Sequence, residues 1–152
     1  MSVEQAAGLA PRLDIVAGDL DALLSPSVPL SAARFWLVHL HGDNLALSRL
    51  LADSIHGSVV YTSQRYCLWP VLGIGGFTDG DRLVTLAMAL GFREIRLIGF
   101  DLDEPRCVGK SSCDLMAKRV KLGVASSIIG YLARYYGYVY WKDRVLIKDS
   151  FM

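Results

Sequence analysis

The sequence predicts an α/β domain of three layers, in which helices cover both faces of a mostly parallel β-sheet. Strand-like and helical segments alternate along the chain, which is typical of parallel sheets. Several strands are near-continuous apolar runs, as in "RFWLVHL" at 34–40, and such strands are buried on both sides. The 152 residues suit a single domain over 1–152, and we expect this domain to be Rossmann-like.

The predicted elements follow in chain order. Strands are expected at 12–17, 34–40, 58–64, 70–74 and 94–100, and helices at 44–55, between 78 and 91, and at 114–137. Thr78 or Asp79 is expected to cap the middle helix and Gly91 to end it. The tail, 138–148, reads as an antiparallel hairpin at the sheet edge. The last helix is predicted to carry one apolar face, formed by Met116, Val120, Val124, Ile128 and Leu132.

Bulk properties exclude several classes of protein. The net charge of +1 lacks the basic footprint of a nucleic-acid binder, and no apolar run is long enough for a membrane span. The first residues do not resemble a secretory signal, so we expect a cytoplasmic protein. Cys67, Cys107 and Cys113 are odd in number and form no CxxC pair. Free thiols are therefore favoured over a disulfide or zinc framework, with a Cys107–Cys113 bridge as the minor alternative.

Acidic clusters follow four of the predicted strands. Because ligands of open parallel sheets bind outside the carboxyl ends of the strands, one edge would collect all four clusters. Crowded carboxylates repel one another without a cation, and Mg²⁺ favours carboxylate oxygens together with phosphates. The clusters are Asp19 with Asp21, Asp43, Asp79 with Asp81, and Asp101 with Asp103.

Candidate phosphate contacts are present as well. Gly75 and Gly76 precede a helix N-terminus, where backbone amides can meet an anion, although they can also simply form a tight turn. Lys118 and Lys121 lie three residues apart and share a helix face, which can equally be a solvated surface. Arg82 is a further cation that can be only a surface charge.

Two local patterns suggest other chemistries. "HLHGD" at 39–43 has the spacing of a zinc hydrolase motif, but only His56 remains as a further histidine ligand. His39 is therefore expected to be a core histidine bonded to a neighbour, and His41 to lie nearer a ligand. "GDLDA" resembles the start of haloacid-dehalogenase-type phosphotransferases, yet Ala22 and Leu23 stand where a glycine and a threonine continue that motif.

Five segments taken in order carry a more specific resemblance: "IVAGDLDA", "VHLHGDN", "GGFTDGDR", "LIGFDLD" and "KRVKL". Together they resemble the archaeal 6-hydroxymethyl-7,8-dihydropterin diphosphokinase family, which is distantly related to the catalytic domain of thiamine pyrophosphokinase. The resemblance runs from about Leu13 to about Leu132. Relatives carry a longer segment before the first aspartate motif, so this chain is short at the N-terminus.

The resemblance implies an Mg²⁺-dependent transferase that moves diphosphate from ATP to a pterin, in archaeal folate or methanopterin synthesis. An aspartate near the acceptor alcohol can take up its proton, and we expect Asp81 or Asp101 to be this catalytic base. Thiamine diphosphokinase, or a truncated relative that binds without turnover, are the alternatives, and the apolar hairpin allows a homodimer. The implied metal site is formed by Asp19, Asp21 and Asp43. The implied nucleotide and substrate contacts are Asn44, Gln64, Gly75, Gly76, Thr78, Asp79, Arg82, Lys118 and Lys121, with Trp69, Phe77 and Asp101 as candidates for a pterin slot.

Overall fold

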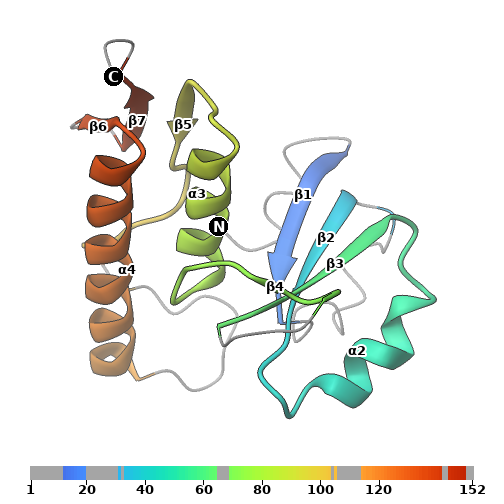
Figure 1. Cartoon of the computed structure of the whole chain (residues 1–152). Coiled ribbons are helices and arrows are strands. Elements are labelled where there is room, and N and C mark those ends of the chain that lie inside the picture. The colour runs from blue at the N-terminus through green and yellow to red at the C-terminus, as the bar shows by residue number, and fades with distance from the viewer. Residues whose placement is uncertain are drawn as a thin grey trace. The chain divides into compact units, whose positions relative to one another are not determined.

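The structure is a computed structural model that describes residues 12–19, 31, 33–64, 69–103, 105, 114–141 and 144–149. The chain divides into two compact units, Met1–Ile74 and Gly75–Met152 (Figure 1). Strands and helices are mixed throughout, so the predicted α/β class is confirmed. A single domain over 1–152 stays a prediction.

The first unit contains a parallel sheet of four strands in the order β1-β2-β3-β4. Its elements are β1 (Leu13–Gly18), β2 (Ala33–His39), α2 (Leu45–Ala52), β3 (Ser58–Ser63) and β4 (Leu72–Gly73). The register pairs Val38 of β2 with Tyr61 of β3, which brings the carboxyl ends of these strands to the same edge. The core consists of Val16, Ala33, Trp36, Val38 and Ile55.

The second unit contains two helices and an antiparallel sheet of three strands in the order β5-β7-β6. Its elements are α3 (Asp79–Ala89), β5 (Glu94–Arg96), α4 (Leu115–Tyr135), β6 (Tyr138–Trp141) and β7 (Val145–Lys148). The core consists of Val84, Met88, Ile129, Ala133, Tyr138 and Leu146. None of the helices that the structure describes is both long and apolar enough to cross a membrane.

The strand predicted at 94–100 pairs differently from expectation. It was expected in the parallel sheet, but β5 ends at Arg96 and pairs antiparallel with β7 of the tail. The reason lies in its pattern: Glu94 and Arg96 are exposed, whereas Ile95 and Leu97 pack against the core. Such period-two alternation is typical of an antiparallel strand with one solvated face.

The predicted apolar face of α4 is present, since Val120, Val124, Ile128 and Leu132 line one groove, but it is largely not the face that α4 buries. Met116 and Val120 are 68% and 63% exposed, and the side chains that α4 buries are instead Leu122, Ala125, Ile129 and Ala133. Ile129 and Ala133 pack against Val84 and Met88 of α3. Small alanines let two helices approach closely, and a prediction based on large side chains undervalues them.

Gly76 is a position where the fold requires glycine. Its φ of 135° lies in a region that other residues rarely adopt, and an added Cβ would lie 2.7 Å from the backbone nitrogen of Arg82. We expect Gly76→Ala to lower the free energy of unfolding by about 1–3 kcal/mol, measured by chemical denaturation. Gly75→Ala is the matched control, because its Cβ would meet nothing closer than a Thr85 methyl at 3.9 Å. Equal stability of the two variants would contradict this account.

Candidate functional site

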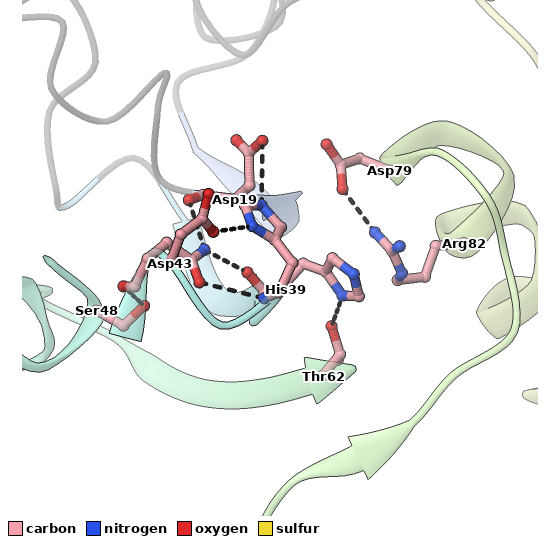
Figure 2. Close-up of polar contacts among 9 residues, drawn as sticks. Asp19, His39, Asp43, Ser48, Thr62, Asp79 and Arg82 are labelled. Atoms are coloured by element: carbon pink, nitrogen blue, oxygen red, sulfur yellow. Dashed lines mark hydrogen bonds and ion pairs between the residues drawn. The ribbon is translucent and has the colours of Figure 1, made fainter. Parts of the chain in front are cut away.

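Polar side chains gather where β1 and β2 end. Asp19 directly follows β1, and the turn from His41 to Asn44 connects β2 to α2. Because β1 and β2 pair in parallel, these residues meet at one edge of the sheet, as predicted (Figure 2). Asp21 lies outside the described residues.

Asn44 holds this edge together. Its Nδ2 donates to the carbonyl oxygens of Asp19, at 3.0 Å, and His39, at 2.7 Å. Its Oδ1 accepts the backbone N–H of His41 at 3.2 Å, and its own carbonyl accepts bonds from the backbone N–H and hydroxyl of Ser48. The buried amide therefore links the end of β1, the end of β2 and the start of α2. This geometry favours a structural role, and direct contact with a cofactor stays a prediction.

His41 lies between two carboxylates. Its Nδ1 is 2.6 Å from Asp43 Oδ1, and its Nε2 is 3.7 Å from Asp19 Oδ2. The hydrogen bond with Asp43 raises the pKa of His41, and the charges of Asp43 and Asp19 act in the same direction. The same hydrogen bond lowers the pKa of Asp43. A protonated His41 thus reduces the repulsion between two neighbouring carboxylates.

The donor set at this edge fits Mg²⁺ in its chemistry. Asp19 and Asp43 offer the hard oxygen ligands that Mg²⁺ prefers, and this ion commonly takes only one or two carboxylates, with phosphate and water completing its shell. The structure groups no three acidic, histidine or cysteine side chains for a metal within the part of the chain it describes. The described residues therefore supply two carboxylates at this edge, and a magnesium site there stays a prediction.

His39 is a buried structural histidine, as expected from the sequence. Its Nδ1 lies 3.2 Å from the hydroxyl of Thr62 on β3, which is itself fully buried (Figure 2). The backbone N–H of Leu40 donates to the carbonyl of Thr62 at 2.8 Å, so pairing between β2 and β3 continues past the strand end.

A cavity of about 570 Å³ opens beside this edge. Gln64, predicted to line a nucleotide or pterin pocket, is one of its walls, and His41 is another. The described residues that line it are His39, Leu40, His41, Gly42, Ser63, Gln64 and Val71.

In the second unit, Asp81 belongs to the capping box at the start of helix α3. Its carboxylate accepts the backbone N–H groups of Phe77, at 2.7 Å, and Thr78, at 2.6 Å, and also the Thr78 hydroxyl. Thr78 in turn accepts from the backbone of Asp81, which completes a capping box and confirms Thr78 as the cap. Asp81 is fully buried, so this geometry favours a structural role over its predicted role as base, which stays untested.

Arg82 is a buried cation beside this cap. It is only 1% exposed, and its Nη1 lies 2.6 Å from Asp79 Oδ1 (Figure 2). Within the described chain, no acceptor lies within hydrogen-bond distance of its Nε. Arg82 is therefore not a surface charge, and its one ion pair leaves the guanidinium incompletely satisfied.

Asp101, the other predicted base, lies in an ion pair. Its Oδ1 is 3.2 Å from the guanidinium of Arg144, which stands between β6 and β7, and it accepts the backbone N–H of Asp103. The backbone of Arg144, at a φ of 60°, accepts the N–H of Leu97. Arg144 carries no signal in the sequence, because only the antiparallel β5–β7 pairing brings it to Asp101.

The remaining predicted contacts lie on exposed or apolar surfaces of the second unit. Gly75 and Gly76 line a groove of about 660 Å³, and its other described walls, on α4, are mainly apolar and include no lysine or arginine. Lys118 and Lys121 share one stretch of α4, half-buried and exposed respectively. Their contact with phosphate stays a prediction, as does the meeting of all four acidic clusters.

Asn44→Asp tests the role of Asn44. The carboxylate keeps the shape of the amide but cannot donate to the carbonyls of Asp19 and His39. We expect the free energy of unfolding, measured by chemical denaturation, to fall by about 1–3 kcal/mol for each buried acceptor left unpaired. Asp43→Asn, one residue away on the exposed side, serves as the control and should change stability little. An Asn44→Asp variant as stable as the parent would refute the structural assignment.

Asp43→Asn tests the pairing with His41. The substitution weakens the hydrogen bond with Asp43, which is the largest cause of the raised pKa, and removes the Asp43 charge, which acts in the same direction. The pKa of His41 should therefore fall toward its ordinary value. An NMR titration of the imidazole resonances measures this directly. Asp14→Asn is the matched control, because Asp14 pairs with Arg34 and lies five residues, or about 16 Å, from Asp19 along β1. Equal shifts in both variants would contradict the pairing.

Two curated proteins are similar to this chain over most of its length. The 6-hydroxymethyl-7,8-dihydropterin pyrophosphokinase of Methanothermobacter thermautotrophicus is 35% identical over 130 residues, which are 80% of this chain and 55% of that protein. The protein of the same name from Pyrococcus furiosus is 39% identical over 94 residues, which are 62% of this chain and 39% of that protein.

The chain thus spans about half the length of the curated relatives it matches. No family model matches the sequence, and no solved structure does. The relation to thiamine pyrophosphokinase stays a prediction. The two matches confirm the family predicted from the motifs: the chain is a homologue of the archaeal 6-hydroxymethyl-7,8-dihydropterin pyrophosphokinases.

Proposed function

We propose that this chain transfers diphosphate from ATP to 6-hydroxymethyl-7,8-dihydropterin, giving AMP and the pterin diphosphate. The observation that carries the proposal is the polar edge formed by Asp19, His41 and Asp43, in a chain whose two curated relatives are named for this activity. The product would serve the synthesis of an archaeal folate-type or methanopterin cofactor.

The reaction exchanges one bond to phosphorus for another. The hydroxymethyl oxygen of the pterin forms a bond to the β-phosphorus of ATP, and the bond from that phosphorus to the oxygen bridging the α- and β-phosphates breaks. AMP leaves with the bridging oxygen, and the proton of the hydroxyl passes to a base. Such transfers depend on positioning and charge stabilisation more than on covalent catalysis.

The side chains of the polar edge would manage charge. Asp19 and Asp43, together with the predicted Asp21, would hold Mg²⁺, which supplies neutralisation of the phosphate oxygens when bound. A protonated His41 adds positive charge at the same edge. The metal ion and the imidazolium would together let the phosphates of ATP lie next to the carboxylates of the chain.

Of the two candidate bases, Asp101 is favoured by the geometry. Its side chain is 20% exposed and can exchange a proton with substrate or solvent. Asp81 is fully buried, and both of its oxygens already accept hydrogen bonds from the start of α3. The Arg144 guanidinium, 3.2 Å from Asp101 Oδ1, would orient that carboxylate.

Release of AMP from ATP, Mg²⁺ and 6-hydroxymethyl-7,8-dihydropterin tests the proposal. We expect turnover by the parent chain and a loss of about 100-fold or more in Asp43→Ala, because a transition-state charge worth several kcal/mol goes unneutralised. Asp14→Ala, which removes a carboxylate at the other end of β1, should keep its rate. A folded parent chain that releases no AMP with the pterin would refute the proposal. The same assay with thiamine identifies a thiamine diphosphokinase, and ligand binding without AMP identifies a non-catalytic relative.

A further inference from the structure

The cavity beside the polar edge has a lining suited to a flat, uncharged ligand. Its volume of about 570 Å³ lies in the usual range for small-molecule sites. Among the residues that the structure describes, this lining includes no aspartate, glutamate, lysine or arginine. Its polar groups are the Gln64 amide, the Ser63 hydroxyl and two imidazoles, and Leu40 and Val71 are apolar. This composition suits a heterocycle with a polar edge better than a phosphate chain.

The walls of the cavity are fixed by the sheet. Ser63 ends β3 and His39 ends β2, and these strands are joined in parallel register up to His39 and Thr62. The contact of His39 with the Thr62 hydroxyl orients one imidazole wall (Figure 2). Ligands of parallel sheets bind at such carboxyl ends, so the position agrees with the lining.

One side chain connects the cavity to the carboxylates. His41 lines the cavity, and it also contacts Asp43 at 2.6 Å and Asp19 at 3.7 Å. A ligand in the cavity would therefore lie one residue away from the predicted metal and phosphate site.

Because the cavity lies so near the carboxylates, its ligand can be chosen between the pterin ring of the acceptor and the adenine ring of ATP. This choice rests on the proposed function. In the acceptor, one carbon separates the ring from the reacting oxygen. In ATP, a ribose and the α-phosphate separate adenine from the reacting β-phosphorus. We propose that the cavity binds the pterin ring of the acceptor, with the Gln64 amide at its polar amino–keto edge.

Gln64 suits this edge because a carboxamide carries both a donor and an acceptor in one plane. The pterin edge presents an amino group, a ring N–H and a carbonyl, which a single amide can meet with two hydrogen bonds. Adenine offers a comparable pair of groups, so the distance argument and the binding test decide between them.

Fluorescence titration with 6-hydroxymethylpterin, in the absence of ATP, tests the proposal. Gln64→Ala should raise the Kd for this pterin about tenfold, as expected for the loss of two hydrogen bonds. Val71→Phe, which fills the cavity without removing a polar group, should weaken pterin binding as well. The Kd of both variants for adenosine, measured by calorimetry, should stay within about twofold of the parent. Asp14→Asn controls for general effects on the first unit.

Three results would overturn the inference: a parent chain that does not bind the pterin, variants that bind it normally, or variants that lose adenosine as much as pterin. The test is separate from that of the proposed function. A chain that binds the pterin through Gln64 but releases no AMP would refute the function alone. A chain that turns over while Gln64→Ala keeps its KM for the pterin would refute the site alone.

Discussion

The polar edge of the first unit depends on the side chain of Asn44, the only asparagine in the chain. Its amide satisfies the last carbonyls of two parallel strands and the N–H of the turn that follows. Buried backbone groups must find partners, also where the strands end. One planar amide meets three of them at once, which fixes the turn that carries His41 and Asp43. The candidate site is therefore a consequence of how the strand ends are closed.

Two kinds of carboxylate occur in this chain, and exposure separates them. Asp81 is fully buried, and its carboxylate accepts hydrogen bonds from two backbone N–H groups in the capping box at the start of α3. The side chain of Asp43 is 84% exposed and pairs with an imidazole, whose charge depends on protonation. Removing Asp81 from its partners would break the start of a helix, whereas Asp43 can exchange its partner at little structural cost. Exposure thus favours Asp43 for binding a cation and Asp81 for stability.

Much of this organisation was predictable, because it rests on local rules. Apolar β-branched runs predicted the parallel strands. Thr78 or Asp79 was predicted to cap the middle helix, and the structure has the cap at Thr78. The partner of 94–97 was not predicted, although its alternation was a local signal, because several sheet edges compete for a short strand. The buried face of α4 includes Ala125 and Ala133, whose small side chains allow close packing between helices. The contact between Arg144 and Asp101 depends on the pairing between β5 and β7, which are far apart in the sequence, so it was not predicted.

The location of the proposed pterin cavity matters because, in the acceptor, the ring that is recognised and the oxygen that reacts can move little relative to each other. Its reacting oxygen is one carbon from the ring, so an error in ring position becomes an error at phosphorus. Sites built on strands hold such positions better than sites built on loops. Here the walls are the ends of β2 and β3, which are joined by the hydrogen bond from the Leu40 N–H, one residue past the end of β2, to the Thr62 carbonyl at 2.8 Å. The main-chain pairing of the sheet would thereby set the distance between the ring and the carboxylates, while the Gln64 side chain would set the orientation of the ring.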